Sequence, residues 1–332
     1  MVQSHKLKSL ISALLIWAAL ALANPLRAEE PFDYFQNSWT VIGLKDYAYG
    51  TRITPDNQLV IRDGDKKPSN ILIRFGQQLI PLTQRATKRL MDGWLPVVSV
   101  TAEDGQVVYE FTFWATPLPS VKEWEKAFDW PVEGENFLNW IVVKVTNTGQ
   151  TAAEAKLKVE RNEPSSLTYK AFVQSLAPGE NVETVVSIPF FPLKEKSDFA
   201  IEDARLWLDR TVEYWRGIMS RAARIRVPCD KATQALLASH VYQLIANDHG
   251  EVHPGEGFYD EFYIRDGAYQ VMQFEEAGLT EISQKAMESF LSRQRPDGRF
   301  ESQKDQFDAN GQACWALWQF YEITGDQQWL AK

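Results

Sequence analysis

The stretch EFYIRDGAYQ, residues 261–270, sets a fixed cation beside a carboxylate at the start of an apolar run. Arg265 offers a planar fork of hydrogen-bond donors, and Asp266 accepts hydrogen bonds. Side by side, the two could hold vicinal hydroxyls of a sugar, because each hydroxyl both donates and accepts. Tyr263 could add a flat face on which a sugar ring stacks. The alternative is that Asp266 is an ordinary helix N-cap and Arg265 its solvated neighbour, and residue chemistry alone leaves both interpretations open.

Further acidic side chains lie in the polar loops around this stretch. The first loop, residues 253–266, also contains Asp260 and Glu261, and the loop before the next apolar run contains Glu301 and Asp308. Paired carboxyl groups can serve as a general acid and a general base. No spacing here marks any of these residues for either role. Asp308 stands just before an apolar run, so a helix cap is the favoured interpretation there.

Metal and disulfide chemistry have weak support in the sequence. Cys229 and Cys314 are the only two cysteines, and neither has a histidine or another cysteine at ligand spacing. Two cysteines cannot define a disulfide scaffold, so whether they pair stays open. His249 and His253 could be metal ligands, but two ordinary loop histidines are the favoured interpretation. We therefore expect no metal and no other cofactor.

The composition favours a neutral partner. The 332 residues carry a formal net charge of −9, which argues against binding of nucleic acid or of an anionic membrane. The chain is 45% hydrophobic and long enough to form more than one domain. Its 12 tryptophans could stack on sugar rings, although filling a core is the simpler explanation. Neutral substrates fit this charge balance better than charged polymers do.

The first 23 residues have the parts of a secretory signal peptide. Lys6 and Lys8 precede an apolar stretch that ends at Ala23 in Ala-Leu-Ala, a small-x-small cleavage pattern. The stretch is short for a membrane span, and no later segment is apolar and long enough to cross a bilayer. We expect residues 1–23 to be removed, with Ala28 as a second possible cleavage point. The mature protein should be exported to the periplasm or beyond, without a membrane anchor.

The first of two halves has the pattern of β structure. Residues 97–116, VVSVTAEDGQVVYEFTFWAT, contain two strand-like runs around Asp104 and Gly105, which is a hairpin signal. Residues 136–149 form another long strand that ends in an Asn-Thr-Gly turn. Short strands at this spacing, without helices between them, predict an antiparallel β-sandwich over residues 31–200.

The second half has the period of helices. Residues 201–227 predict an amphipathic linker helix, and from residue 228 to 332 every long segment reads as helix. Segments with one apolar stripe alternate with segments that are apolar nearly all round. The one-sided segments are 231–247 and 279–294, and the all-round segments are 267–278 and 311–325. A one-sided helix lies at a surface and an all-round one is enclosed, so the pattern predicts two outer–inner hairpins in concentric layers.

Three segments together resemble the first two hairpins of the six-hairpin glycosidases, most closely the glucoamylase-like glycoside hydrolases. They are YIRDGAYQVMQFEEAGL (263–279), PDGRFESQ (296–303) and FDANGQACWALWQFYEITGDQQWL (307–330). The resemblance implies an (α/α) toroid of six hairpins, preceded by a β-sandwich and a helical linker, with the active site at the loop end. It also implies that Arg265 and Asp266 bind hydroxyls of the sugar in the innermost subsite, which Tyr263 lines.

The resemblance places the general acid and base in later hairpins, so we expect the catalytic residues beyond residue 332. Within the chain, Asp266 is the one candidate acid, since some more distant six-hairpin families use an early-loop Asp. Four helices cannot close an inner ring, so we expect a fragment that is inactive alone and leaves Trp315, Trp318 and Phe320 partly uncovered. The expected function is an exported glycoside hydrolase acting on oligo- or polysaccharides. A sugar phosphorylase on the same barrel and a non-catalytic carbohydrate-binding protein are the alternatives, and the oligomeric state stays open.

Overall fold

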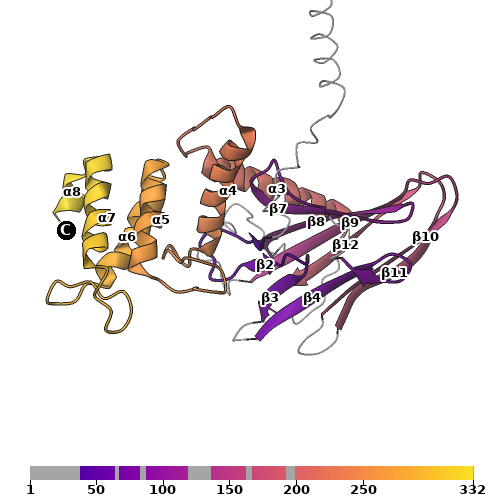
Figure 1. Cartoon of the computed structure of the whole chain (residues 1–332), viewed down its shortest axis with the longest axis horizontal. Helices are drawn as coiled ribbons and strands as arrows, with labels where there is room; N and C mark the ends of the chain where they lie inside the picture. The colour runs from indigo at the N-terminus through magenta and orange to yellow at the C-terminus, as the bar shows by residue number, and fades with distance from the viewer. Residues whose placement is uncertain are drawn as a thin grey trace, which may run out of the picture.

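The computed structural model describes most of the chain after the expected signal peptide. The described residues are 38–63, 67–82, 87–118, 136–161, 167–191 and 199–331. The predicted signal peptide, residues 1–23, lies outside them. None of the helices in these ranges is long and apolar enough to cross a lipid bilayer. Figure 1 shows the strands gathered at one end of the molecule with helix α3 (Ile201–Met219) beside them, and helices at the other end.

The strands form two antiparallel sheets. The larger has the order β1-β2-β3-β4-β10-β11, with β5 paired to β4, and the smaller has the order β12-β9-β8-β7-β6. The strands of the larger sheet are β1 (Thr40–Ile42), β2 (Thr51–Ile53), β3 (Leu59–Asp63), β4 (Lys67–Phe75), β5 (Ile80–Pro81), β10 (Ala153–Arg161) and β11 (Leu167–Leu176). Those of the smaller sheet are β6 (Thr87–Met91), β7 (Leu95–Asp104), β8 (Val107–Pro117), β9 (Phe137–Asn147) and β12 (Asn181–Pro189). The predicted antiparallel β structure before the helices is confirmed.

Two of the tryptophans are core residues of the smaller sheet, on strands β8 and β9. Trp114 and Trp140 are fully buried and stack with their ring centroids 5.8 Å apart. The Nε1 of Trp140 donates to the Thr116 hydroxyl at 2.8 Å, which satisfies its polar end. The predicted hairpin is confirmed too, since β7 ends at Asp104 and Gly105 in the turn has a φ of 61°. A glycine adopts that left-handed conformation without steric cost.

Helix α3 (Ile201–Met219) packs on the smaller sheet, against strands β8, β9 and β12. It buries Trp207 and Trp215 and leaves charged residues outside. The predicted linker helix over 201–227 therefore ends early, at Met219. The chain then continues without helix, and the Ala223 amide donates to the Ala277 carbonyl at 2.6 Å. That bond ties the linker to the helical part.

Five further helices follow. They are α4 (Asp230–Ala246), α5 (Ile264–Glu276), α6 (Thr280–Ser292), α7 (Asn310–Thr324) and α8 (Gln327–Leu330). Helix α4 contacts strands β1 and β7 as well as α5, so it joins the two parts of the molecule. Helix α5 contacts α6 and α7, and the three lie side by side away from the sheets in Figure 1. The described helices thus agree with mixed β and α architecture, whereas a six-hairpin toroid stays a prediction.

Helices α5 and α7 are not enclosed on all sides in the described structure, and the expectation that Trp315 and Trp318 are partly uncovered is confirmed. Helix α5 buries Val271 but leaves Tyr269 63% exposed, and α7 leaves Trp315 37% and Trp318 50% exposed. Phe320 was expected to be partly uncovered, but it is buried because Trp329 of α8 lies against it, with ring centroids 4.9 Å apart. Each of the two helices therefore buries one side and presents aromatic residues on the other.

Candidate functional site

An exposed ion pair joins the starts of helices α5 and α7. The Nη1 of Arg265 donates to both carboxylate oxygens of Asp308, at 2.8 and 2.7 Å, although the residues are 43 positions apart. The two side chains are 38% and 63% exposed. A solvent-exposed pair of this kind contributes about 0–1 kcal/mol to stability. The pair therefore contributes little to folding stability. Both side chains are exposed, so a polar ligand can reach them.

Neither acidic side chain caps its helix, so the cap interpretation is wrong for both. The N-cap of α5 is Tyr263, which makes no side-chain cap, and Asp266 is the third helical residue, exposed to solvent. The N-cap of α7 is Ala309, one residue after Asp308. The carboxylate that Arg265 contacts is that of Asp308, and the sugar-binding role expected of Arg265 and Asp266 stays a prediction.

Aromatic side chains gather in the loop that precedes Arg265. Tyr259 packs edge-on against Tyr263, with ring centroids 5.9 Å apart, and against Phe258 at 4.8 Å. Phe258 is 74% and Tyr259 62% exposed. Tyr263 is half-buried, as expected for a residue that lines a subsite rather than a core. The loop before α5 thus offers flat apolar faces with hydroxyl groups at their edges.

A second aromatic contact continues the same surface along the helices. Tyr269 of α5 lies 5.6 Å from Trp315 of α7, measured between ring centroids. Tyr269 follows Arg265 by four residues, so the two lie on one face of α5. The face defined by Arg265, Asp308, Tyr269 and Trp315 is therefore polar at the loop end and aromatic further along.

The two loops before α5 and α7 hold each other in place. The buried hydroxyl of Ser302 accepts a hydrogen bond from the Ile264 amide at 2.9 Å, and the Gln303 side chain donates to the Phe262 carbonyl at 2.7 Å. Asn310 accepts from the Phe300 amide at 2.7 Å. Sequence reasoning missed Ser302, because a lone serine in a polar loop carries no signal of a partner 38 residues away.

The other candidate carboxylates have structural partners or stand alone on the surface. Glu301 accepts from the Asp305 amide at 2.7 Å and from Arg295 at 3.1 Å, and these contacts lower its pKa. Asp260 accepts from the Gly257 amide at 3.0 Å and contacts a histidine. Glu261 is exposed. The described residues therefore do not form an evident acid–base pair at the loop end.

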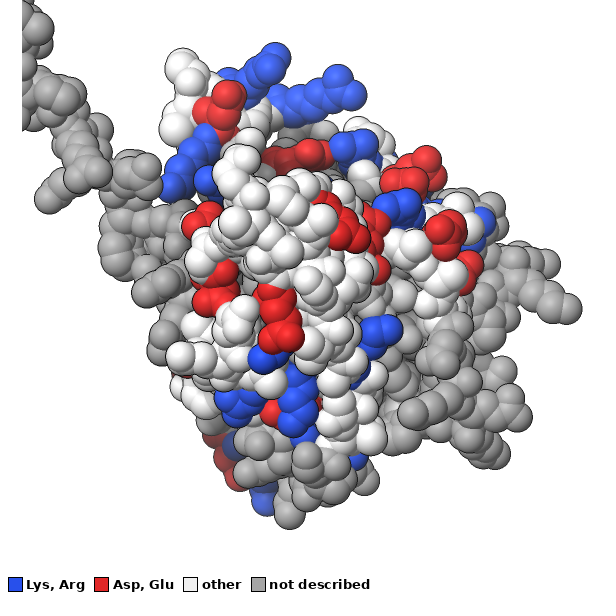
Figure 2. All heavy atoms as spheres, turned by 90° about the vertical axis from the view of Figure 1, so that its right-hand side faces the viewer, with Lys and Arg blue, Asp and Glu red and all other residues white. Residues whose placement is uncertain are grey.

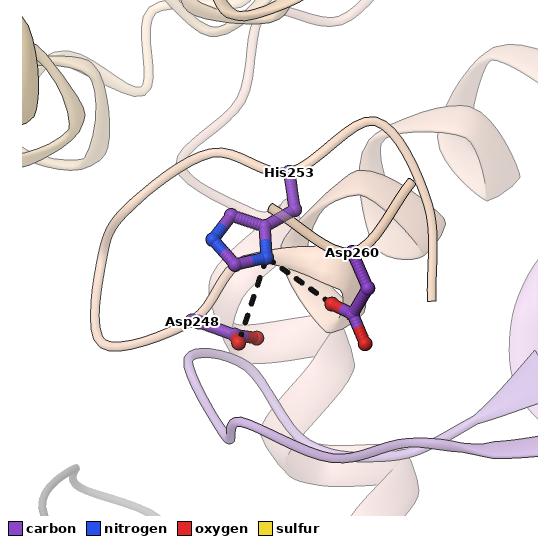
Figure 3. A group of neighbouring side chains, drawn as sticks. All are labelled: Asp248, His253 and Asp260. Carbon is purple, nitrogen blue, oxygen red and sulfur yellow. Dashed lines mark hydrogen bonds and ion pairs between the residues drawn. The ribbon is translucent and has the colours of Figure 1, made fainter. Parts of the chain in front are cut away.

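A second group of ionisable residues lies deeper in the first loop. His253 is 6% exposed; its Nδ1 lies 3.1 Å from Asp260 and 3.5 Å from Asp248, and its Nε2 lies 3.2 Å from Glu251. Figure 3 shows both aspartates approaching the same imidazole nitrogen, Nδ1. Burial alone would lower the pKa of His253, but its hydrogen bonds with Asp260 and Glu251 and the charge of Asp248 raise it to about 9. His253 is therefore charged at neutral pH, unlike an ordinary loop histidine, whereas His249 is exposed.

The spacing of these atoms is also compatible with a metal ion. One ligand atom each from Asp248, His253 and Asp260 lies within 4.8 Å of the others. A metal would have to displace the proton from the histidine Nδ1, and here two carboxylates stabilise that proton. The geometry thus fits an ion-pair cluster, and the expected absence of a metal stays a prediction.

Helix α5 also carries a buried acid at its far end. Glu275 is 2% exposed, and neither of its carboxyl oxygens has a hydrogen-bond partner within the described ranges. Burial, together with the charge of Glu276, raises the pKa of Glu275 to about 8. A protonated carboxyl could serve as a general acid, but this one lies at the opposite end of α5 from the polar loops. It is therefore not part of the loop-end site.

The sandwich offers less chemistry than the loop end. A hollow of about 260 Å³ lies beside strands β4 and β5 of the larger sheet, and it is lined by Asp56, Asn57, Gln58, Leu72, Ile73, Arg74, Pro81 and Leu82. No helical residue lines it. Figure 2 shows Lys and Arg interspersed with Asp and Glu on the sandwich end, without a broad area of one sign among the residues described there. Such a surface does not favour nucleic acid. Cys229 and Cys314 are both free and exposed.

No family model and no curated protein matches the sequence. A solved structure titled a putative kojibiose phosphorylase from human microbiome is similar to the chain, with a TM-score of 0.41 and 10% sequence identity. The match covers 90% of this chain and 56% of that chain, so the chain spans little more than half the length of the solved structure. A likeness this distant does not assign an activity.

Proposed function

We propose that this chain binds a neutral oligosaccharide at the loop end of helices α5 and α7, as part of an exported glycoside hydrolase of the six-hairpin kind. The observation that carries the proposal is the exposed pair of Arg265 and Asp308, together with the contact of Tyr259 and Tyr263 in the loop that leads to Arg265. The resemblance of the three helical segments to six-hairpin glycosidases supports the same site. The net negative charge of the chain also agrees with a neutral ligand.

Each residue has a distinct part in such a site. The guanidinium of Arg265 donates to hydroxyl oxygens, and the carboxylates of Asp308 and Asp266 accept hydroxyl protons. Tyr259 and Tyr263 present ring faces to the apolar C–H face of the sugar. Asp266 is exposed at the loop end, so it stays the candidate acid of this chain in our proposal.

The test is oligosaccharide binding by the purified protein, measured by calorimetry and by native mass spectrometry. Arg265→Lys and Asp308→Asn should each weaken binding about tenfold or more, since hydrogen bonds to charged groups contribute about 1.5–3 kcal/mol. Arg216→Lys is the matched control, because Arg216 forms an exposed pair with Asp92 at 2.6 Å on the sandwich side. Equal affinities of all three variants and the wild type would refute the sugar site.

Reaction assays separate the forms of the proposal. Release of free sugar without phosphate supports a hydrolase, and phosphate-dependent release of a sugar phosphate supports a phosphorylase. Binding without either reaction supports a carbohydrate-binding protein. Incubation with oligosaccharides in phosphate-containing and phosphate-free buffer, followed by product chromatography, distinguishes the three.

A further inference from the structure

The cluster around His253 connects three structural elements. Asp248 follows the end of α4 by two residues, Asp260 precedes α5, and Glu251 contacts Arg293 at the end of α6, with 3.7 Å between Nη2 and Oε2. The imidazole of His253 lies between these carboxylates. The cluster is thus the place where the loop between α4 and α5 is fixed to the helices on both sides.

We infer that charged His253 clamps residues 248–260 and thereby positions Tyr259 and Tyr263 beside Arg265. In this inference His253 is a positioning residue, which acts on ligand binding through the loop that it holds. The part that concerns sugar rests on the proposed function. The clamp itself rests only on the geometry of the cluster.

Both ring nitrogens of His253 take part in the clamp. Charged imidazole donates from both nitrogens, so it can bond Asp260 at 3.1 Å and Glu251 at 3.2 Å at once. The main chain is held as well, because the Gln270 side chain of α5 donates to the His253 carbonyl at 2.7 Å. A neutral imidazole would keep only one N–H, so it could satisfy only one of the two carboxylates.

The backbone of the clamped segment needs such support. Tyr259 has a φ of 54° and His249 a φ of 54°, a left-handed conformation that non-glycine residues seldom adopt. Asp260, the neighbour of Tyr259, is held by His253 and by the Gly257 amide at 3.0 Å. The clamp therefore maintains the turn that leaves Tyr259 exposed and in contact with Tyr263.

The surrounding charges set the direction of the pH response. Three carboxylates face the ring, and Arg293 contacts only Glu251 among them. Nearby, Lys285 pairs with Asp46 at 3.6 Å rather than with the cluster. Loss of the imidazole proton would leave the carboxylates repelling one another. Because the folded pKa of His253 is raised, the clamp is complete at and below pH 6.5 and is lost as pH rises through about 9.

The test is hydrogen exchange of residues 248–263 in the purified protein between pH 6.5 and 10, corrected for the intrinsic pH dependence of exchange. In the wild type, exchange of this segment should become about tenfold faster or more as pH passes 9. His253→Gln should exchange fast at every pH and bind oligosaccharide at least about tenfold more weakly at pH 7. The control is His249→Asn, because asparagine tolerates the left-handed backbone at this position. This variant should behave as wild type.

A second variant keeps the test decisive if His253→Gln fails to fold. Asp248→Asn removes one of the negative charges that favour the charged imidazole, so it should move the exchange transition to lower pH. A flat exchange profile in the wild type, or an unmoved transition in Asp248→Asn, would overturn the clamp. A stoichiometric divalent metal in the purified protein, whose removal by a chelator frees the segment at pH 7, would overturn it in favour of a metal site. A pH-dependent segment in a protein that binds no oligosaccharide would uphold the clamp and refute the proposed function.

Discussion

At the scale of single residues, the pair of Arg265 and Asp308 allows an effect on ligand binding to be distinguished from an effect on folding stability. The pair is exposed, so solvent screens it, and a double-mutant cycle of Arg265→Lys and Asp308→Asn should show a coupling below about 1 kcal/mol in the free energy of unfolding. Urea unfolding of the four proteins measures this coupling. A coupling of several kcal/mol would mean that the pair is structural, and loss of sugar affinity in the variants would then be indirect.

Glu275 makes stability depend on pH in a definite direction. Burial holds its folded pKa near 8, above the ordinary value of 4.5, so the folded state binds its proton more tightly than the unfolded state does. The stability associated with this residue is therefore greatest below pH 4.5 and is lost as pH rises to about 8. Glu275→Gln removes the ionisable group. Relative to the wild type, the free energy of unfolding of this variant should therefore increase by on the order of 2 kcal/mol or more between pH 5 and 8.5.

Urea unfolding at pH 5 and pH 8.5 checks this prediction. The matched control is Glu276→Gln, the exposed neighbour on the same helix, which should show a much smaller change between the two pH values. An equal difference between Glu275→Gln and the wild type at both pH values would contradict the raised pKa.

At the scale of elements, helix α8 shows how a short segment covers an apolar face. The Asp326 carboxylate accepts from the Gln328 amide at 2.9 Å and from the Trp329 amide at 3.1 Å, which makes it a true N-cap. Trp329 is 6% exposed and covers Phe320 of α7. The cap therefore fixes the residue that completes the packing of α7.

Asp326→Ala should destabilise the protein by about 1 kcal/mol, the usual cost of removing a cap. Asp326→Asn should be close to wild type, because Asn caps a helix about as well as Asp. The free energy of unfolding of both variants checks this. An Asn variant as unstable as the Ala variant would show that the charge of Asp326, rather than the cap, is what matters.

At the scale of the whole molecule, the two parts differ in how completely they cover their apolar residues. The sandwich buries most of its large aromatic residues, among them Trp114, Trp140 and Phe113, whereas helices α5 and α7 leave Tyr269 and Trp318 at least half exposed. Buried apolar area contributes about 25 cal/mol per Å². The sandwich should therefore be the more stable part.

Limited proteolysis should cut first between about residues 222 and 310 and spare the strands of the sandwich. The segment after α3 is the expected first site, because Arg224 and Arg226 are exposed and lie outside any helix or strand. Mass spectrometry of trypsin fragments over time locates the cuts. Equal resistance of both parts would mean that the exposed aromatic face of α5 and α7 does not weaken the helical part.

Features that depend on neighbouring residues were determined by the sequence alone. The alternation of apolar residues and the Asp104–Gly105 turn predicted the antiparallel strands β7 and β8, since strand period and turn conformation are local properties. The apolar stripe through Ala204, Trp215 and Met219 likewise predicted helix α3 and its buried face. The sequence also indicated the loop end as the place of interest, through the polar and aromatic residues around Arg265.

Only the tertiary structure decided which side chains meet. It paired Arg265 with Asp308, removed Asp266 from the cap position, and placed His253 among three carboxylates. It also left Glu275 buried without a described partner. Contacts between distant segments follow from how helices and loops pack, and a change of one residue in a helix end redirects a side chain by about 100°. The periodicity of the sequence does not specify which distant side chains meet. The contacts within the site therefore became known only from the tertiary structure.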